Sequence, residues 1–205
     1  MRRVVVFCLA LLTLTPAEAQ MYKGTETAAY TVERTLEGAE LRSYGPHLVA
    51  EVTVHGSRSA AANAGFRSLA GYIFGANADA SKIAMTTPVA QVPDAADAAG
   101  TLKSGADAAQ SWTVRFTMPA DLSLAALPVP DDPRIRLIET GPRRMLVLQF
   151  TGRPTDAALA GAAASLRAIA ARAGLKVRGE PEFLFYDSPF TLPWNRRNEV
   201  ALVLD

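Results

Sequence analysis

Cysteine and histidine are nearly absent from this 205-residue chain. Cys8 is the only cysteine, and it lies inside an apolar stretch near the N-terminus. Beyond that stretch, a disulfide, a thiolate nucleophile, a zinc–thiolate site and a cysteine ligand to iron are therefore excluded. The only imidazoles belong to His47 and His55, so a Ser-His-Asp triad or a histidine metal site has few residues to draw on.

Long runs of like charge and of apolar residues are also missing. The 21 basic and 20 acidic residues are interspersed, which argues against nucleic acid and against a polybasic membrane patch. The apolar stretch at residues 4–14 is shorter than the ~20 residues that span a bilayer. Two arginines precede it and a small-x-small tripeptide follows it, which predicts a cleaved secretory signal peptide at residues 1–19 rather than an uncleaved anchor. We therefore expect an exported protein, periplasmic or secreted, with one domain at residues 20–205 and no stable membrane insertion after cleavage.

Two segments about half a chain apart resemble each other. Residues 41–56 read LRSYGPHLVAEVTVHG, and residues 137–152 read LIETGPRRMLVLQFTG, with the Gly-Pro pair and the final Gly in register. Because Gly-Pro pairs punctuate β-rich runs, each segment predicts a β-hairpin. A helix is predicted after each segment from apolar residues at i, i+4, i+7 and i+11. These are Ala62, Phe66, Leu69 and Ile73 in the first half and Leu159, Ala163, Leu166 and Ala170 in the second.

The remaining patterns complete a repeated unit. Ser57 or Ser59 is expected to cap the first helix and Thr155 the second. Further strands are predicted at residues 82–91 and 112–118 after the first helix, and at 183–186 and 199–204 after the second, with an exposed loop at 92–111. The predicted fold is α+β: a duplicated ββαββ unit forming a distorted, mostly antiparallel β-barrel, with two long helices packed outside.

Two motifs are more specific than these patterns. KIAMTTPV at residues 82–89 and YDSPFTLPWNRRNEV at residues 186–200 closely resemble the two signatures of the SOUL haem-binding family. The resemblance runs from about Tyr30 to the C-terminal strand. It implies that haem or a free porphyrin lies non-covalently in a shallow groove between the first helix and the loop before the last strand.

On this chain the resemblance assigns the groove to one set of side chains. A flat tetrapyrrole buries its faces against aliphatic and aromatic groups, whereas its propionates need a cation or solvent at the rim. Arg196 and Arg197 are candidate cations, although Arg197 is alternatively a partner of Glu199 or Glu182. Likewise, the helix residues and Met85 also suit a core. The predicted ligand contacts are Phe66, Leu69, Ala70, Ile73, Met85, Phe190, Trp194 and Arg197.

The ligand of a haem iron is left open. Haem iron is commonly held by histidine or methionine, which makes His47, His55 and Met85 the candidates. None of them aligns with a family ligand, so no metal-ligating residue is assigned.

Other classes of function compete with tetrapyrrole binding. By fold analogy, gyrase-inhibitor-like domains use a buried carboxylate beside aromatic residues to bind or hydrolyse lipophilic compounds, and Glu199 with Trp194 is the candidate pair here. The alanine-rich helix at residues 157–173 alternatively offers a flat surface to a protein partner. No nucleophile elbow or metal-hydrolase pattern is present. We therefore expect a binding protein without catalytic residues, whose protein partners are unknown.

Overall fold

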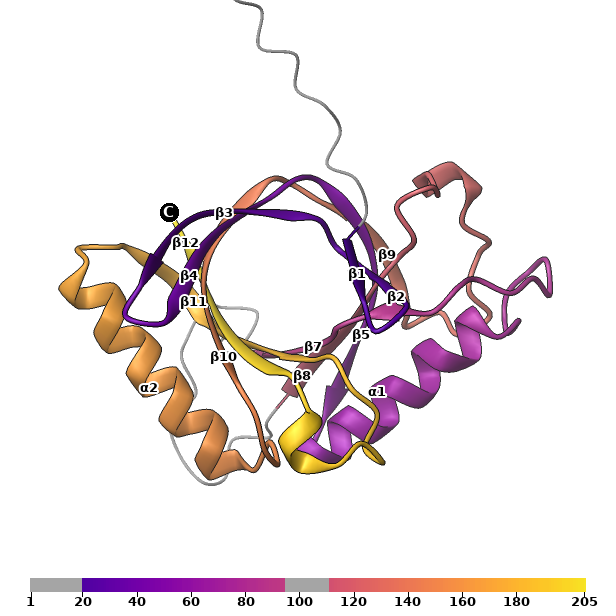
Figure 1. The fold of residues 1–205 in the computed structure, drawn as a ribbon. Helices are drawn as coiled ribbons and strands as arrows, with labels where there is room; N and C mark the ends of the chain where they lie inside the picture. The colour runs from indigo at the N-terminus through magenta and orange to yellow at the C-terminus, as the bar shows by residue number, and fades with distance from the viewer. Residues whose placement is uncertain (1–19, 95–110) are drawn as a thin grey trace, which may run out of the picture.

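The computed structural model describes residues 20–94 and 111–205, so the predicted signal peptide and most of the predicted 92–111 loop lie outside the described residues. The described chain is α+β, as predicted. Two helices, α1 (Arg58–Ile73) and α2 (Asp156–Arg172), lie outside a curved sheet (Figure 1). The sheet contains β3 (Tyr30–Leu36), β4 (Ala39–Tyr44), β5 (His47–His55), β7 (Val89–Pro93), β8 (Ser111–Thr117), β9 (Arg136–Thr140), β10 (Arg143–Phe150), β11 (Val177–Phe185) and β12 (Asn198–Leu204).

The two halves of the chain contribute strands in the same order. The sheet has nine strands in the order β3-β4-β10-β12-β11-β7-β8-β5-β9, and every neighbouring pair is antiparallel. In the first half, β8 lies between β5 and β7; in the second, β12 lies between β10 and β11. Pairing of β7 with β11, and of β4 and β5 with β10 and β9, joins the halves.

The predicted hairpins at the two Gly-Pro pairs are wrong. Instead of pairing with each other, β4 pairs with β10 and β5 with β9. Tyr44 faces Arg143 and His47 faces Thr140, so one register continues past both Gly-Pro pairs. Neither glycine of these pairs has a positive φ, which tight two-residue hairpins require. Each Gly-Pro pair therefore carries the chain onward from one strand pair to the next.

The tight hairpins lie at other glycines. Lys23 and Gly24 have φ of 48° and 81°, and Glu37 and Gly38 have φ of 48° and 85°. Positive φ at both central residues is the signature of a type I′ turn. The first turn joins β1 (Gln20–Tyr22) to β2 (Thr25–Thr27), and the second joins β3 to β4. Along its other edge β2 pairs in parallel with β6 (Thr86–Thr87), which makes a separate three-stranded sheet.

The helices begin where predicted, but α1 buries a different face. The hydroxyl of Ser57 accepts the Ala60 amide at 3.4 Å, and that of Thr155 accepts the Ala158 amide at 3.2 Å, which confirms both caps. On α1 the buried residues are Ala61, Gly65, Leu69, Tyr72 and Ile73.

The lack of a side chain at Gly65 explains why α1 turns this face toward the sheet. An added Cβ at Gly65 would lie 2.6 Å from Val114 Cγ2, so the helix backbone approaches β8 there more closely than any larger residue permits. The predicted inward position of Phe66 is therefore wrong: its side chain remains 41% exposed and stands edge-on to Phe116 at 5.4 Å between ring centroids. None of the helices in the described part of the chain has the length and apolar character needed to span a membrane.

Candidate ligand-binding site

The loop before β12 is braced at its base and inside. The Asp187 carboxylate accepts the Arg197 amide at 2.7 Å, and the Tyr186 amide donates to the Arg197 carbonyl at 3.2 Å. Arg196 then crosses the loop, donating to the carbonyls of Thr191 at 2.7 Å and Pro189 at 2.5 Å. We call residues 187–197 the apolar loop. Its backbone is held by its own polar groups, which leaves its apolar side chains free to face outward.

The hairpin of β1 and β2 fastens the apolar loop. Lys23 Nζ donates to Asp187 Oδ1 at 2.6 Å and to the Asn195 carbonyl at 2.8 Å, and the Tyr22 hydroxyl donates to Asp187 Oδ2 at 2.9 Å. Burial alone would raise the pKa of Asp187, but hydrogen bonds from the Arg197 amide, Lys23 and Tyr22 outweigh burial and lower it. Asp187 therefore stays ionised and joins the loop to the N-terminal hairpin. The sequence predicted no such role for Asp187, and the Lys23-Gly24 turn is its one local signal.

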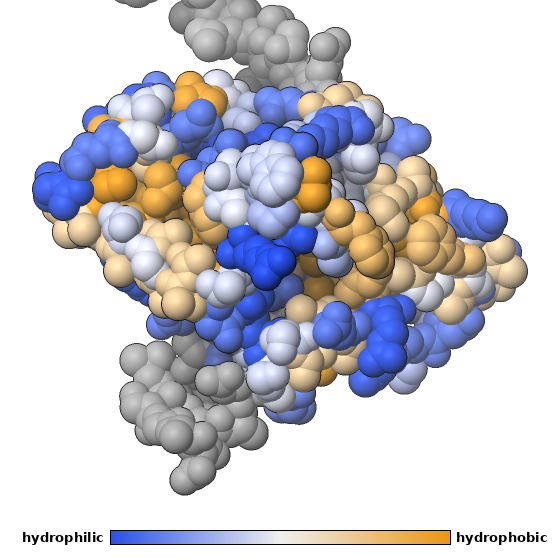
Figure 2. All heavy atoms as spheres, turned by 60° about the horizontal axis from the view of Figure 1, so that its bottom comes forward, coloured by the Kyte–Doolittle hydropathy of each residue, from blue (hydrophilic) through white to orange (hydrophobic). Residues whose placement is uncertain are grey.

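Exposed apolar side chains gather on three segments: α1 with Phe74 at its end, residues 82–85 before β6, and the apolar loop. Phe190 is 95% exposed and Trp194 68%. In Figure 2 apolar residues cover much of the side on which α1 lies. Six of the ten large apolar side chains exposed in the described residues belong to these segments: Phe66, Phe74, Met85, Phe190, Leu192 and Trp194.

The apolar loop lies near the start of α1. Its short 3-10 helix η2 (Pro193–Asn195) is held by the Gly152 amide, which donates to the Pro193 carbonyl at 2.9 Å. Two residues further on, the Pro154 carbonyl accepts Arg58 Nη2 at 3.0 Å. Figure 1 shows the same neighbourhood, with η2 beside the first turn of α1. Of the predicted contacts, the structure thus leaves Phe66, Met85, Phe190 and Trp194 open to a ligand.

The other predicted contacts are placed differently. Leu69 and Ile73 are 0% and 1% exposed and form part of the core between α1 and the sheet. Ala70 is half-buried. Arg197 turns inward, and its Nη2 lies 2.6 Å from Glu199 Oε1. These four residues therefore pack or pair within the protein, and their side chains offer a ligand little surface.

Glu199 lies at the centre of a buried polar cluster. Its two oxygens accept Arg42 Nη1 and Nη2, each at 3.0 Å, and Oε2 also accepts the Tyr186 hydroxyl at 2.8 Å. The guanidinium of Arg42 stacks on Tyr30 at 4.2 Å, and that of Arg197 on Tyr186 at 4.1 Å. Burial lowers the pKa of both arginines. The interactions with Glu199 outweigh burial and raise the pKa of each, so both stay charged.

This cluster does not form the carboxylate–aromatic pair of the gyrase-inhibitor-like alternative. Glu199 is 0% exposed and its oxygens are engaged by two guanidinium groups, whereas Trp194 is 68% exposed on the apolar loop. Glu199 lines neither the cavity beside His47 nor the smaller pocket that shares His47 with it. Its charge is therefore neutralised within the protein, and a ligand outside has no route to it through those cavities.

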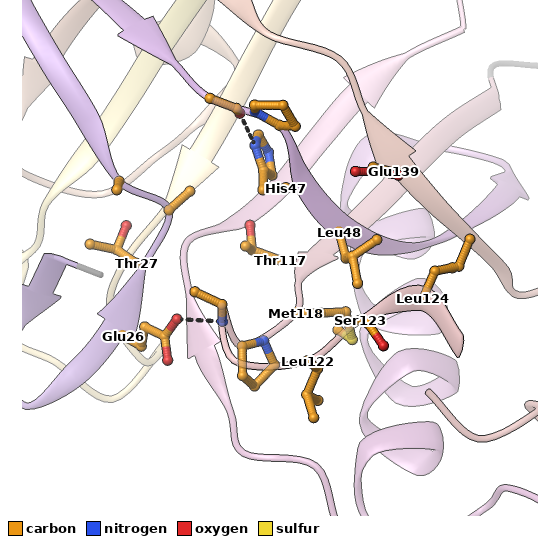
Figure 3. Close-up of a pocket in the computed structure, with 16 residues that line it drawn as sticks. Glu26, Thr27, His47, Leu48, Thr117, Met118, Leu122, Ser123, Leu124 and Glu139 are labelled. Carbon is orange, nitrogen blue, oxygen red and sulfur yellow. Dashed lines mark hydrogen bonds between the residues drawn. The ribbon is translucent and has the colours of Figure 1, made fainter. Parts of the chain in front are cut away.

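The two histidines lie apart from each other. His55 is exposed at the end of β5. His47, at the other end of β5, lines a cavity of about 480 Å³ (Figure 3). Within the described residues, no group of three histidine, cysteine or carboxylate side chains has the arrangement of a metal site.

Several proteins of known structure share this fold at low sequence identity. The C-terminal domain of EcmrR superimposes with a TM-score of 0.60 at 12% identity, over 86% of this chain and 98% of that one. An uncharacterized conserved protein and a hydrolase, both from Listeria innocua, give TM-scores of 0.58 and 0.55 at 12% and 11% identity, over 83% and 84% of this chain and 93% and 94% of theirs. At such identities the likeness shows a shared fold and nothing about activity.

A match to a protein-family model shows which family the chain belongs to. The model of the SOUL heme-binding protein family matches residues 25–203, nearly all of the described chain. The chain belongs to this family, which confirms the resemblance of the two signature motifs. No curated protein sequence matches the chain significantly.

Proposed function

We propose that this protein binds haem or a related tetrapyrrole non-covalently in a groove between α1 and the apolar loop. Two observations support this: the chain belongs to the SOUL family, and six of the ten large apolar side chains exposed in the described residues lie on the segments that would border the groove. A soluble protein exposes such a set at a cost unless a ligand covers it. Phe66, Met85, Phe190 and Trp194 would contact the ring faces.

The propionates need cations other than the predicted arginines. Arg197 is committed to Glu199, and Arg196 to the carbonyls of its own loop. Arg67, next to Phe66 on α1, and Lys82, in the segment before Met85, are exposed and form no ion pair within the described residues. We assign propionate binding to these two side chains. The residues present therefore fit a tetrapyrrole without requiring a ligand to its metal.

We propose that the halves are copies of one ββαββ unit that together form a distorted barrel, which the shared strand order and the continuous register at the Gly-Pro pairs support. We further propose export after cleavage of residues 1–19, and a task of buffering, carrying or scavenging the tetrapyrrole without chemical turnover. The leader-like sequence supports export.

A matched pair of leucines tests the groove. Leu192 on the apolar loop is 52% exposed, and Leu124, which lines the His47 cavity, is 46% exposed. In Soret titrations of residues 20–205 with haem and with protoporphyrin, Leu192→Ala and Trp194→Ala should each weaken binding about three- to thirtyfold, because they remove apolar contact area. Leu124→Ala should leave binding unchanged. Weakening by Leu124→Ala alone would place the ligand in the cavity and contradict the proposed groove.

A further inference from the structure

The His47 cavity is a second concave site, separate from the apolar loop. It has a volume of about 480 Å³, within the range of about 300–1,000 Å³ typical of small-molecule sites. Its walls come from β2, the start of β5, the end of β8, the segment after β8 and the end of β9 (Figure 3). No residue of α1 or of the apolar loop lines it. A ligand here would therefore be independent of the proposed tetrapyrrole.

The polar side chains of this cavity carry negative charge or accept hydrogen bonds. Among the described residues that line it, Glu26 and Glu139 are the only charged ones, and none is a lysine or arginine. Glu26 Oε1 already accepts the Ala120 amide at 2.7 Å, whereas Glu139 forms no ion pair within the described residues. The excess of carboxylate therefore favours a ligand that brings a positive charge.

His47 adds a further acceptor. Its Nδ1 lies 3.0 Å from the Gly45 carbonyl, so Nδ1 carries the hydrogen and Nε2 of the neutral ring has a free lone pair. Burial lowers the pKa of His47, and the positive charges of Arg143 and Arg115 lower it further, although the Gly45 carbonyl and Glu182 act in the opposite direction. The neutral ring is therefore the favoured form near pH 7. Its Nε2 can accept a hydrogen bond from a donor group of a ligand.

Much of the remaining lining is apolar, alongside the hydroxyl groups of Thr27, Thr117 and Ser123. Leu48, Met118, Leu122 and Leu124 line the cavity together with prolines and alanines. A small inorganic cation would gain nothing from these groups, whereas an alkyl or aryl chain would bury against them. From the charge and the walls together, we propose that this cavity binds a small amphiphilic ammonium ion, with its nitrogen at Glu139, whose register partner on β5 is Leu48, and its apolar part against the leucines.

Two arginines beside the cavity are paired with carboxylates. A smaller pocket of about 40 Å³ shares His47 and Thr117 with the cavity and is lined by Arg115 and Arg143. Arg115 Nε lies 2.6 Å from Glu51, and Arg143 Nη1 lies 2.9 Å from Glu182. Both carboxylates are buried, so these pairs are screened little by solvent. Each of these two arginines therefore has a carboxylate partner, whereas Glu139 forms no ion pair within the described residues.

Three probes with one tail and different heads test the proposal. Octylammonium, octanoate and 1-octanol are titrated into residues 20–205 below the concentrations at which they self-associate, and binding is followed by amide chemical shifts. Octylammonium should bind saturably and at least about tenfold more tightly than octanoate, whose charge the carboxylates repel. Equal binding of the three probes, or no saturable binding of octylammonium, would overturn the proposal.

Variants locate the site. Glu139→Gln should weaken octylammonium binding about two- to fivefold, as expected for a solvent-facing ion pair. Asp79→Asn, at an exposed carboxylate outside the cavity, is its control and should have no effect. Leu124→Ala should weaken octylammonium but not protoporphyrin, and Leu192→Ala the reverse. If Leu192→Ala weakens octylammonium binding, or Glu139→Gln leaves it unchanged, the proposed site is refuted. The proposed tetrapyrrole groove is tested separately, by the titrations with haem and protoporphyrin.

Discussion

Replacing Glu199 by glutamine should destabilise the fold far more than an ordinary surface substitution. Glu199 is fully buried, and the Arg42 side chain that meets it through two hydrogen bonds is only 2% exposed. Removing one partner of a buried ion pair costs about 3–5 kcal/mol, because the remaining charge stays in a poorly solvated place. Glu40, which also contacts Arg42 at 2.8 Å, offsets part of this cost. We therefore expect a loss of about 3 kcal/mol, or roughly 6–12 °C in Tm for a domain of this size.

Urea unfolding at constant m measures this loss. Glu180→Gln is the control, since Glu180 and Arg167 form an exposed pair at 3.0 Å whose contribution should stay below about 1 kcal/mol. In a double-mutant cycle, Arg42→Met should cost less in the Glu199→Gln protein than in the wild type, because the two side chains interact directly. Equal losses for Glu199→Gln and Glu180→Gln, or strict additivity in the cycle, would refute the reasoning.

Further predictions concern packing and pH. Gly65→Ala should destabilise the protein by about 1–3 kcal/mol in urea unfolding, because the added Cβ meets Val114 at 2.6 Å, whereas Gly161→Ala, on the exposed side of α2 with open space around the added Cβ, should stabilise it by about 0.5–1 kcal/mol. Equal signs for the two would contradict this. The lowered pKa of His47 means that the unfolded chain takes up the proton first as pH falls below about 6.5. Stability should therefore decrease with acidification, and His47→Gln should reduce that decrease in unfolding measurements from about pH 7.5 to about pH 5.

The fold was predictable where local chemistry determines it. The caps at Ser57 and Thr155 follow from hydroxyl side chains before apolar periodicity, and the structure bears them out. The two Gly-Pro pairs misled the prediction, because a Gly-Pro pair marks an interruption of a strand without saying whether the chain reverses. That choice depends on which distant strand takes up the free edge, as β10 does for β4. Such pairing is invisible in a local pattern.

The candidate site was predictable in part. The motif at residues 186–200 identified the apolar loop, where the structure leaves Phe190 and Trp194 exposed. It did not reveal that Arg197 turns inward, because the cluster around Glu199 depends on Arg42, 157 residues away in sequence. The inward face of α1 was misjudged for a similar reason: the close contact of Gly65 with β8 is a tertiary feature.

Ring-current shifts test the proposed groove most directly. Protoporphyrin without metal is added to protein labelled at leucine and methionine methyl groups, and the shifts are followed residue by residue. A porphyrin between α1 and the apolar loop should shift the methyl resonances of Leu192 and Met85 strongly and leave those of Leu124 and Met118, which line the His47 cavity, nearly in place. Strong shifts at Leu124 and Met118 with none at Leu192 would contradict the account.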